Sequence, residues 1–423
     1  MNLSRQSELL MSFFIENKCI SHIQQTKKTN NLFINLFYEF KDAEEYIEMR
    51  KKREGREFYN LIIKEIQTTS EIVMPTTFPS DGFPAKIREH INDQMMNQLC
   101  YSISLIDRNI KIYFLVEGNI SEKDIKIYNG YVDRMLMWLV IMNEYASKQC
   151  AKVLTIYLYF TSLKKTVPSS SLLVLGEYHV NTAFTMTCPK ISEIVVFRKE
   201  EWFKVFLNET FHNFGLDFSD MNNSFCDTKM LSIFPVKSEV NLFESYTEFW
   251  AKIMNILFCS YLNLKNKQDI DEFLKNTEFF LSFERMYSFF QMVKVLDFMN
   301  LNYEQLYKKG SKYDAIRDTL YKENTNVLAY YIITAILMND YQVFLEWCNS
   351  NNTSLLQFKK TTSNQEKLCE FIVKKYKTTG FLKEIQCIEK LFRTLKSNKN
   401  KNLSTKNMNF ILKNLRMTIC ELN

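Results

Sequence analysis

Residues 194–215 read Ile-Val-Val-Phe-Arg-Lys-Glu-Glu-Trp-Phe-Lys-Val-Phe-Leu-Asn-Glu-Thr-Phe-His-Asn-Phe-Gly. The first four are β-branched or aromatic and predict a buried strand. Large apolar residues then recur at helical spacing, so we expect a helix with an apolar face packed on a sheet. Glu200 and Glu201 suit the first turn of that helix because negative charge is favourable at a helix N-terminus. Gly215 provides a stop, since glycine readily adopts the left-handed conformation that ends helices.

The second half of this helix contains Asn208-Glu209-Thr210-Phe211-His212. Zinc metallopeptidase helices carry H-E-x-x-H, because residues at i and i+4 share a face and two imidazoles can hold one metal. The intervening glutamate then polarises the metal-bound water. Here Asn208 stands in place of the first histidine. The sequence therefore indicates either a metallopeptidase or a protein with that shape and an incomplete site.

Composition bounds the possible answers. A chain of 423 residues with 46% hydrophobic and 14% aromatic residues can bury two or three cores. Only 8 Gly and 6 Pro favour helices with a minor sheet. The formal charge of +6 is spread thinly, whereas a dedicated nucleic-acid binder concentrates its basic residues, so no specific nucleic-acid partner is expected.

Cysteine usage and hydropathy predict a soluble protein of a reducing compartment. The ten cysteines form no CxxC pair, and several lie in apolar runs, so we expect reduced thiols in the core. The N-terminal residues lack the apolar stretch of a secretion signal, so we do not expect the chain to be secreted. The longest uncharged apolar run, residues 327–338, is short of the ~20 residues that a membrane helix needs, so no membrane span is expected.

The first 75 residues have helical periodicity and predict an N-terminal helical segment. Their basic cluster, Arg50-Lys-Lys-Arg53, could contact phosphate, but the surrounding acidic residues favour a solvated helix face. Residues 74–84 contain three of the six prolines and mark the best domain boundary.

Beyond this boundary the pattern alternates and predicts strands. Residues 101–107 and 110–116 read as a hairpin around Arg108-Asn109, and residues 153–160, 178–185 and 194–197 read as further strands. Helices are expected at residues 124–149, 242–259, 269–299, 312–321, 326–348, 365–375, 381–396 and 404–415. We therefore predict an α+β domain over residues 85–300 with a small mixed or antiparallel sheet, followed by a C-terminal helical domain over residues 301–423.

The order edge strand, strand, E-x-x-H helix, loop and second helix resembles the gluzincins, the thermolysin-like branch of the zincin metallopeptidases. The resemblance covers residues 101 to about 260. More specifically, residues 180–185, 197–206 and 209–219 resemble a family of uncharacterised proteins from large DNA viruses whose helix usually reads H-E-T-F-H. The resemblance implies a zincin-like fold for residues 85–300 and a location in the host cytoplasm or the virion.

Carried over residue by residue, the resemblance gives each position a role. It implies that His212 is the second zinc ligand, Glu209 the general base and Glu244 the third ligand, with Asn208 at the first ligand position. Glu248 would orient His212 through the ring nitrogen that does not bind the metal. Residues 181–185 would form the sheet edge on which an extended peptide lies, with Asn181, Thr182, Ala183 and Phe184 contacting it.

Several alternatives stay open. His212 could be an ordinary core histidine, and His179 could be a replacement ligand or a plain polar residue. An amide oxygen at Asn208 is a poorer zinc ligand than imidazole, so zinc would bind weakly or not at all. We expect a pseudoenzyme with a peptide-binding or structural role and a peptide or protein partner; the alternative is an active zinc metallopeptidase that uses Glu209 as its base. The sequence does not indicate an oligomeric state.

Overall fold

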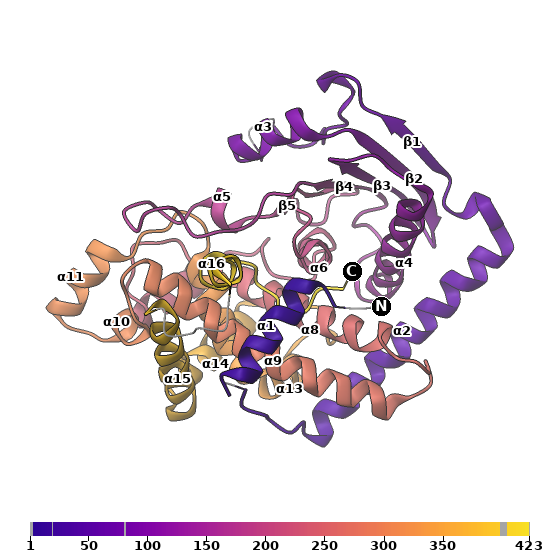
Figure 1. Cartoon of the computed structure of the whole chain (residues 1–423). Helices are drawn as coiled ribbons and strands as arrows, with labels where there is room; N and C mark the ends of the chain where they lie inside the picture. The colour runs from indigo at the N-terminus through magenta and orange to yellow at the C-terminus, as the bar shows by residue number, and fades with distance from the viewer. Residues whose placement is uncertain (1–2, 19, 80–81, 398–403, 423) are drawn as a thin grey trace. The chain divides into compact units, whose positions relative to one another are not determined.

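The computed structural model describes residues 3–18, 20–79, 82–397 and 404–422. The chain forms two compact units, each assembled from segments that are distant in sequence (Figure 1). The helical unit comprises residues 1–30, 165–181 and 221–423, and the sheet unit comprises residues 31–164 and 182–220. The ranges predicted from sequence, 1–75, 85–300 and 301–423, are continuous, whereas the chain passes between the two units more than once.

A mixed six-stranded sheet in the order β1-β2-β3-β4-β6-β5 organises the sheet unit. Its strands are β1 Leu61–Glu65, β2 Asn97–Leu105, β3 Arg108–Val116, β4 Val153–Phe160, β5 Ala183–Thr185 and β6 Ile191–Val196. The neighbours β3, β4 and β6 run parallel, while the pairs β1–β2, β2–β3 and β5–β6 are antiparallel. The predicted α+β class with a small mixed sheet is confirmed.

Three details of the sheet differ from the prediction. Strand β1 lies within residues 1–75, which were predicted to be a helical segment. The β2–β3 hairpin turns at Ile106 and Asp107, two residues before the predicted position, because Leu105 and Arg108 are the last paired residues. Residues 178–185 are not one extended segment. They begin inside the short helix α5 (Glu177–Val180), which closes when the amide of Asn181 donates to the carbonyl oxygen of Glu177 at 2.8 Å.

Helices cover both faces of the sheet (Figure 1). One face packs against α4 (Glu122–Tyr145) and α6 (Trp202–Asn213), which are joined by a 2.6 Å hydrogen bond from Trp138 Nε1 to Thr210 Oγ1. Ser121 and Asp124 start α4 with a reciprocal capping box. The opposite face is covered by α3 (Ala85–Gln94) and the proline-rich segment before it, through aromatic contacts such as Phe83 with Tyr159.

The proline-rich segment is part of the sheet unit. Glu193 on β6 accepts hydrogen bonds from the amides and hydroxyls of Thr76 and Thr77 at 2.5–3.0 Å, and from the hydroxyl of Tyr157 at 3.1 Å. One buried carboxylate thus fixes residues 74–79 against the sheet, where the sequence had indicated a boundary.

Helix α2 (Lys27–Glu54) carries the basic cluster near its C-terminal end. Arg50 pairs with Glu54 one turn on, and Lys51 contacts Asp133 of α4 at 2.5 Å. These two basic residues therefore form ion pairs within the sheet unit.

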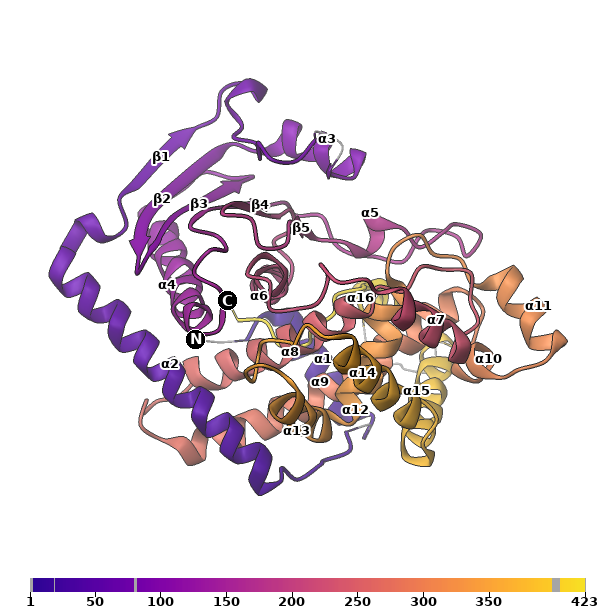
Figure 2. The ribbon, with the colours of Figure 1, turned by 180° about the vertical axis from the view of Figure 1, so that it is seen from behind.

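The helical unit is built around α8 (Leu242–Leu262) and α9 (Ile270–Phe298), two long and largely buried helices (Figure 2). Around them lie α1 Arg5–Glu16, α7 Ser224–Ile233, α10 Tyr303–Tyr307, α11 Ser311–Leu320, α12 Thr334–Asn339, α13 Tyr341–Asn351, α14 Thr362–Lys375, α15 Thr379–Lys396 and α16 Thr405–Lys413. Aromatic residues fill the contacts, as where Phe14 of α1 meets Tyr287 and Phe290 of α9 edge to face.

The predicted helix over residues 326–348 is instead three pieces. A π-helical turn, Leu328–Ile333, leads into α12, and the backbone of Asp340 leaves the helical region before α13 begins. The bend between residues 328–339 and α13 is 93°. Among the described residues no single helix has the length and hydropathy to cross a membrane, and only this bent pair meets that test jointly.

The structure corrects one cysteine prediction. Cys150 and Cys188 form a disulfide with a Cα–Cα distance of 4.5 Å, so these two are not reduced thiols. The bridge joins the start of β4 to the loop before β6, where the amide of Ala151 also donates to the carbonyl oxygen of Pro189. Cys226, Cys259, Cys348, Cys369 and Cys420 are buried free thiols, as expected.

Candidate functional site

Helix α6 positions the predicted site residues of the sheet unit. Glu201 has a left-handed backbone (φ 49°), so the helix begins at Trp202. Glu200 and Glu201 therefore precede the first turn instead of lying in it. At the other end Gly215 also has a positive φ, 65°, and the amide of Leu216 donates to the carbonyl oxygen of Phe211 at 2.9 Å. The predicted glycine stop is confirmed.

The turn at Gly215 brings Asp217 back against His212. Nδ1 of His212 is hydrogen-bonded to Oδ2 of Asp217, whose side chain is fully buried. Asp217 also accepts from the hydroxyl of Ser219 at 3.0 Å, and that hydroxyl lies 2.8 Å from the hydroxyl of Thr187. An ionised carboxylate only accepts hydrogen bonds, so opposite such a group His212 would carry its proton on Nδ1, which would make Nε2 the nitrogen for ligation or proton transfer.

Asn208 and Glu209 lie in the same helix, one turn before His212. The i to i+4 spacing places Asn208 and His212 on one face. Both Asn208 and Glu209 are buried, with 7% and 8% of their surface exposed. Thr210 is used structurally, since its hydroxyl accepts from Trp138 and donates to the carbonyl oxygen of Leu207.

The other two predicted site residues belong to the helical unit. Glu244 lies in the first turn of α8, where its Oε1 is 3.5 Å from Nδ2 of Asn326. Glu248 lies one turn later, 3.9 Å from Nζ of Lys252. Approach of either glutamate to His212 would be a contact between the two units and stays a prediction.

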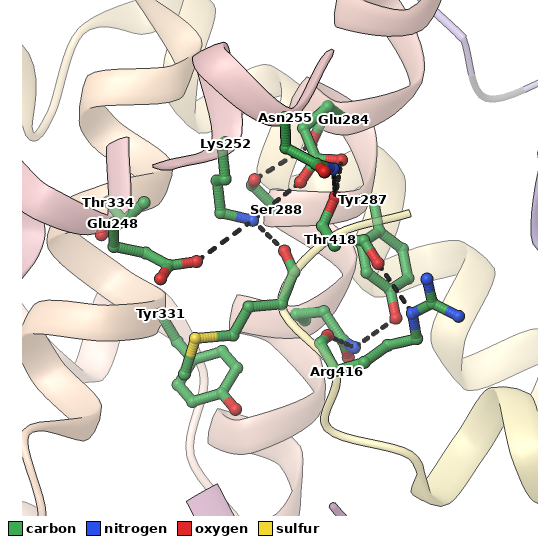
Figure 3. A network of polar contacts seen from close by, with 12 residues as sticks. Glu248, Lys252, Asn255, Glu284, Tyr287, Ser288, Tyr331, Thr334, Arg416 and Thr418 are labelled. Atoms are coloured by element: carbon green, nitrogen blue, oxygen red, sulfur yellow. Dashed lines mark hydrogen bonds and ion pairs between the residues drawn. The ribbon is translucent and has the colours of Figure 1, made fainter. Parts of the chain in front are cut away.

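Glu248 borders a buried polar network that sequence reasoning did not find (Figure 3). Lys252 of α8 contacts Glu284 of α9 at 2.8 Å and donates to the carbonyl oxygen of Met417. Glu284 in turn accepts from the hydroxyl of Thr418 at 2.8 Å and from the amide of Ile419 at 2.9 Å. The network holds the C-terminal segment in the core, and its only sequence signal is a set of isolated charges within apolar helices.

Within α6 the predicted donor set contains one imidazole, His212, and whether it holds zinc stays a prediction. Within the described ranges, no three His, Cys, Asp or Glu side chains are grouped so that they could hold a metal ion. Asn208 offers a neutral amide oxygen where the resemblance places an imidazole, and zinc favours nitrogen and sulfur ligands.

The predicted peptide edge is present as β5, which ends the sheet order. The amide of Phe197 donates to the carbonyl oxygen of Thr182 at 2.8 Å. This bond shows which residues of β5 direct their main-chain groups toward β6 and which direct them away. Because antiparallel pairs alternate, Phe184 bonds to β6, while the main-chain groups of Ala183 and Thr185 point away from it. Two of the four predicted contact residues, Asn181 and Thr182, precede the strand, and Oδ1 of Asn181 accepts from Thr325 within the helical unit.

No protein-family model, curated protein or solved structure matches this chain. The residue that sequence reasoning missed is Asp217, and the available signal was an acidic residue placed two positions after a helix-ending glycine. His179, the candidate replacement ligand, lies in α5 of the helical unit, where its Nδ1 is 3.3 Å from the amide of Gly176.

Proposed function

We propose that this chain is a peptide-binding protein on a metallopeptidase-like scaffold, and that it holds its partner without cleaving it. The observation that carries the proposal is the end position of β5 in the sheet. An extended peptide can add to such an edge by main-chain hydrogen bonds, which require no particular side chains. The resemblance to the viral protein family is consistent with this role and is part of the proposal.

The geometry of β5 supports a specific pairing. Ala183 and Thr185 each present an amide and a carbonyl group on the side away from β6. The side chain of Phe184 anchors the strand, with its ring centre 4.8 Å from that of Phe78 and 5.1 Å from that of Phe83. The side chain of Thr185 accepts from Asn213 at the end of α6 at 2.8 Å. A strand held in this way would bind a peptide without first having to become ordered.

The chemistry of α6 argues for binding over cleavage. Hydrolysis of a peptide bond in the zincin manner requires a metal to polarise the carbonyl and activate water, and Glu209 supplies neither function alone. Asn208 occupies the position at which the first metal ligand would be needed. The second candidate function, an active zinc peptidase with Glu209 as base, is favoured by one observation: the buried Asp217–His212 pair, an arrangement that commonly orients metal-binding histidines.

Proline scanning of the sheet edges tests the proposal. Peptides selected from a random display library against the full chain should bind, and Ala183→Pro should weaken them about tenfold, because proline removes an outward amide. Proline is tolerated at an edge position whose amide faces away from the sheet. The matched control is Ile63→Pro on β1, the opposite edge, where the bond from Ile66 N to Met96 O places the Ile63 amide outward in the same way.

Two outcomes would reject the proposal. One is unchanged peptide affinity in a folded Ala183→Pro variant. The other is cleavage of a mixed peptide library by the wild type that disappears in Glu209→Gln, which would establish the peptidase alternative.

A further inference from the structure

A pocket of about 330 Å³ lies in the sheet unit at the carboxyl ends of β3 and β4. It is lined by the loop of residues 117–120 after β3, the first turns of α4, and residues that follow β4 and β6. The carboxyl ends of parallel strands are where ligands bind in open sheets that carry helices. The volume is within the range of small-molecule sites.

One wall of the pocket is aromatic. The rings of Tyr128 and Phe160 lie 6.2 Å apart, and Phe114 supports both from the sheet at 5.0 and 5.4 Å. Burial raises the pKa of Tyr128, so its phenol is a neutral hydrogen-bond donor at physiological pH. Tyr128 is half-buried and Phe160 is only 4% exposed, so Tyr128 provides most of the ring surface that a flat apolar group can contact.

The remaining walls carry charges of both signs. Glu117 is fixed by Nε2 of His90 and the amide of Ser162, both at 2.6 Å. Asp124 accepts from the hydroxyl and amide of Ser121; these hydrogen bonds lower the pKa of Asp124, and the positive charges of Lys123 and then Lys199 add to the effect. Lys199 also lines the pocket and is exposed to solvent, with Nζ 6.0 Å from the centre of the Phe160 ring.

We propose that this pocket binds a free α-amino acid with an aromatic side chain. Two fixed carboxylates disfavour a purely anionic ligand, and Lys199 disfavours a purely cationic one. A zwitterion satisfies both, with its carboxylate at Lys199 and its ammonium group at Asp124 and Glu117. The side chain then lies on Tyr128 and Phe160. This site is separate from β5 and α6, so it does not depend on the peptide-binding proposal.

Three compounds with the same ring test the proposal on the full chain. L-Phenylalanine carries both charges, 3-phenylpropionate lacks the ammonium group and phenethylamine lacks the carboxylate. Calorimetry and ligand-observed NMR should show that L-phenylalanine binds about tenfold more tightly than either analogue, because each analogue loses one charge-assisted contact.

Two lysine variants locate the site. Lys199→Met should remove the preference for L-phenylalanine over phenethylamine while its preference over 3-phenylpropionate persists. Lys164→Met is the control, since Lys164 is an exposed lysine of the same unit that lies 4.0 Å from Glu200, outside the pocket. Equal binding of all three compounds, no binding of any at millimolar concentration, or loss of the preference in Lys164→Met but not in Lys199→Met would overturn the proposal.

Discussion

Asp217 shows how one buried side chain can define a site. Its carboxylate accepts from His212 and Ser219 with no exposure to solvent. Both carboxylate oxygens of Asp217 take part in hydrogen bonds, one with His212 and one with Ser219, whereas an asparagine amide has only one accepting oxygen. For Asp217→Asn we therefore expect the free energy of unfolding to fall by about 1–3 kcal/mol. Urea titration of the variant measures this, with Asp93→Asn on exposed helix surface as the control. Equal loss in the two variants would mean that the Asp217 contacts are energetically silent.

We predict that Asn208 decides whether zinc binds at α6. We expect the purified wild type to retain well under one zinc per chain after dialysis. Asn208→His should raise that content toward one, because the new imidazole shares a helix face with His212 one turn away. Metal content by mass spectrometry of the two proteins checks the expectation, and Asn208→Gln controls for a change of size without imidazole. Stoichiometric zinc in the wild type would contradict it.

At the scale of elements, Glu193 makes the attachment of the proline-rich segment sensitive to pH. Burial opposes ionisation of Glu193, but hydrogen bonds from Thr77 and Thr76 outweigh it and lower the pKa below 4.5. A carboxylate with a lowered pKa stabilises the fold above its unfolded-state pKa, and this contribution is lost as pH falls through the lower, folded-state value.

The corresponding prediction concerns acid stability. Between pH 7 and pH 3, the free energy of unfolding of the wild type should fall more steeply than that of Glu193→Gln, because the variant has no charge to lose at this position. Denaturant titrations across that range give both slopes. Glu65→Gln, an exposed change on β1, should behave as the wild type does. If the free energy of unfolding falls equally with pH in the wild type and in Glu193→Gln, ionisation of Glu193 does not contribute to acid stability.

At the scale of the whole molecule, the helical unit brings the two ends of the chain together. The amide of Ser4 donates to the carbonyl oxygen of Glu421 at 2.7 Å, and Leu3 forms a bridge with Leu422. Glu284 holds the preceding C-terminal residues, Thr418 and Ile419. The C-terminal segment is therefore part of the core of this unit.

Removing one member of the buried pair should be costly. Glu284→Ala removes the nearer of the two carboxylates that contact Lys252 in the core, at 2.8 Å against 3.9 Å for Glu248, and we expect the free energy of unfolding to fall by about 3–5 kcal/mol. Lys252→Met combined with Glu284→Gln should cost less than the two single changes added together, since the double variant removes both members of the 2.8 Å pair and only Glu248, 3.9 Å from Lys252, loses a charged neighbour. Hydrogen exchange should locate the loss of protection to α8, α9 and residues 414–422. Additive losses in the double variant would contradict a coupled pair.

The sequence by itself determined the α+β class, the strand over residues 153–160 and most helix positions, because local periodicity and β-branched runs are properties of short segments. It also determined the glycine stop at Gly215, which depends on backbone conformation alone. Asn208, Glu209 and His212 were singled out because their i, i+1 and i+4 spacing in one helix can be read from the sequence, and their role as a site stays a prediction.

Tertiary structure decided what depends on residues that are distant in sequence. The Cys150–Cys188 disulfide joins residues 38 positions apart, and the hydrogen bonds of Glu193 with Thr76 and Thr77 join residues more than 100 positions apart. Nothing in the local sequence pattern indicates such pairs. The same holds for the division into two units and for Lys252 with Glu284. Asp217 lies only five residues from His212, yet the chain reversal at Gly215 was needed to make them partners. Local sequence fixes conformation over a few residues, whereas burial, charge pairing and cross-links depend on which segments the fold brings together.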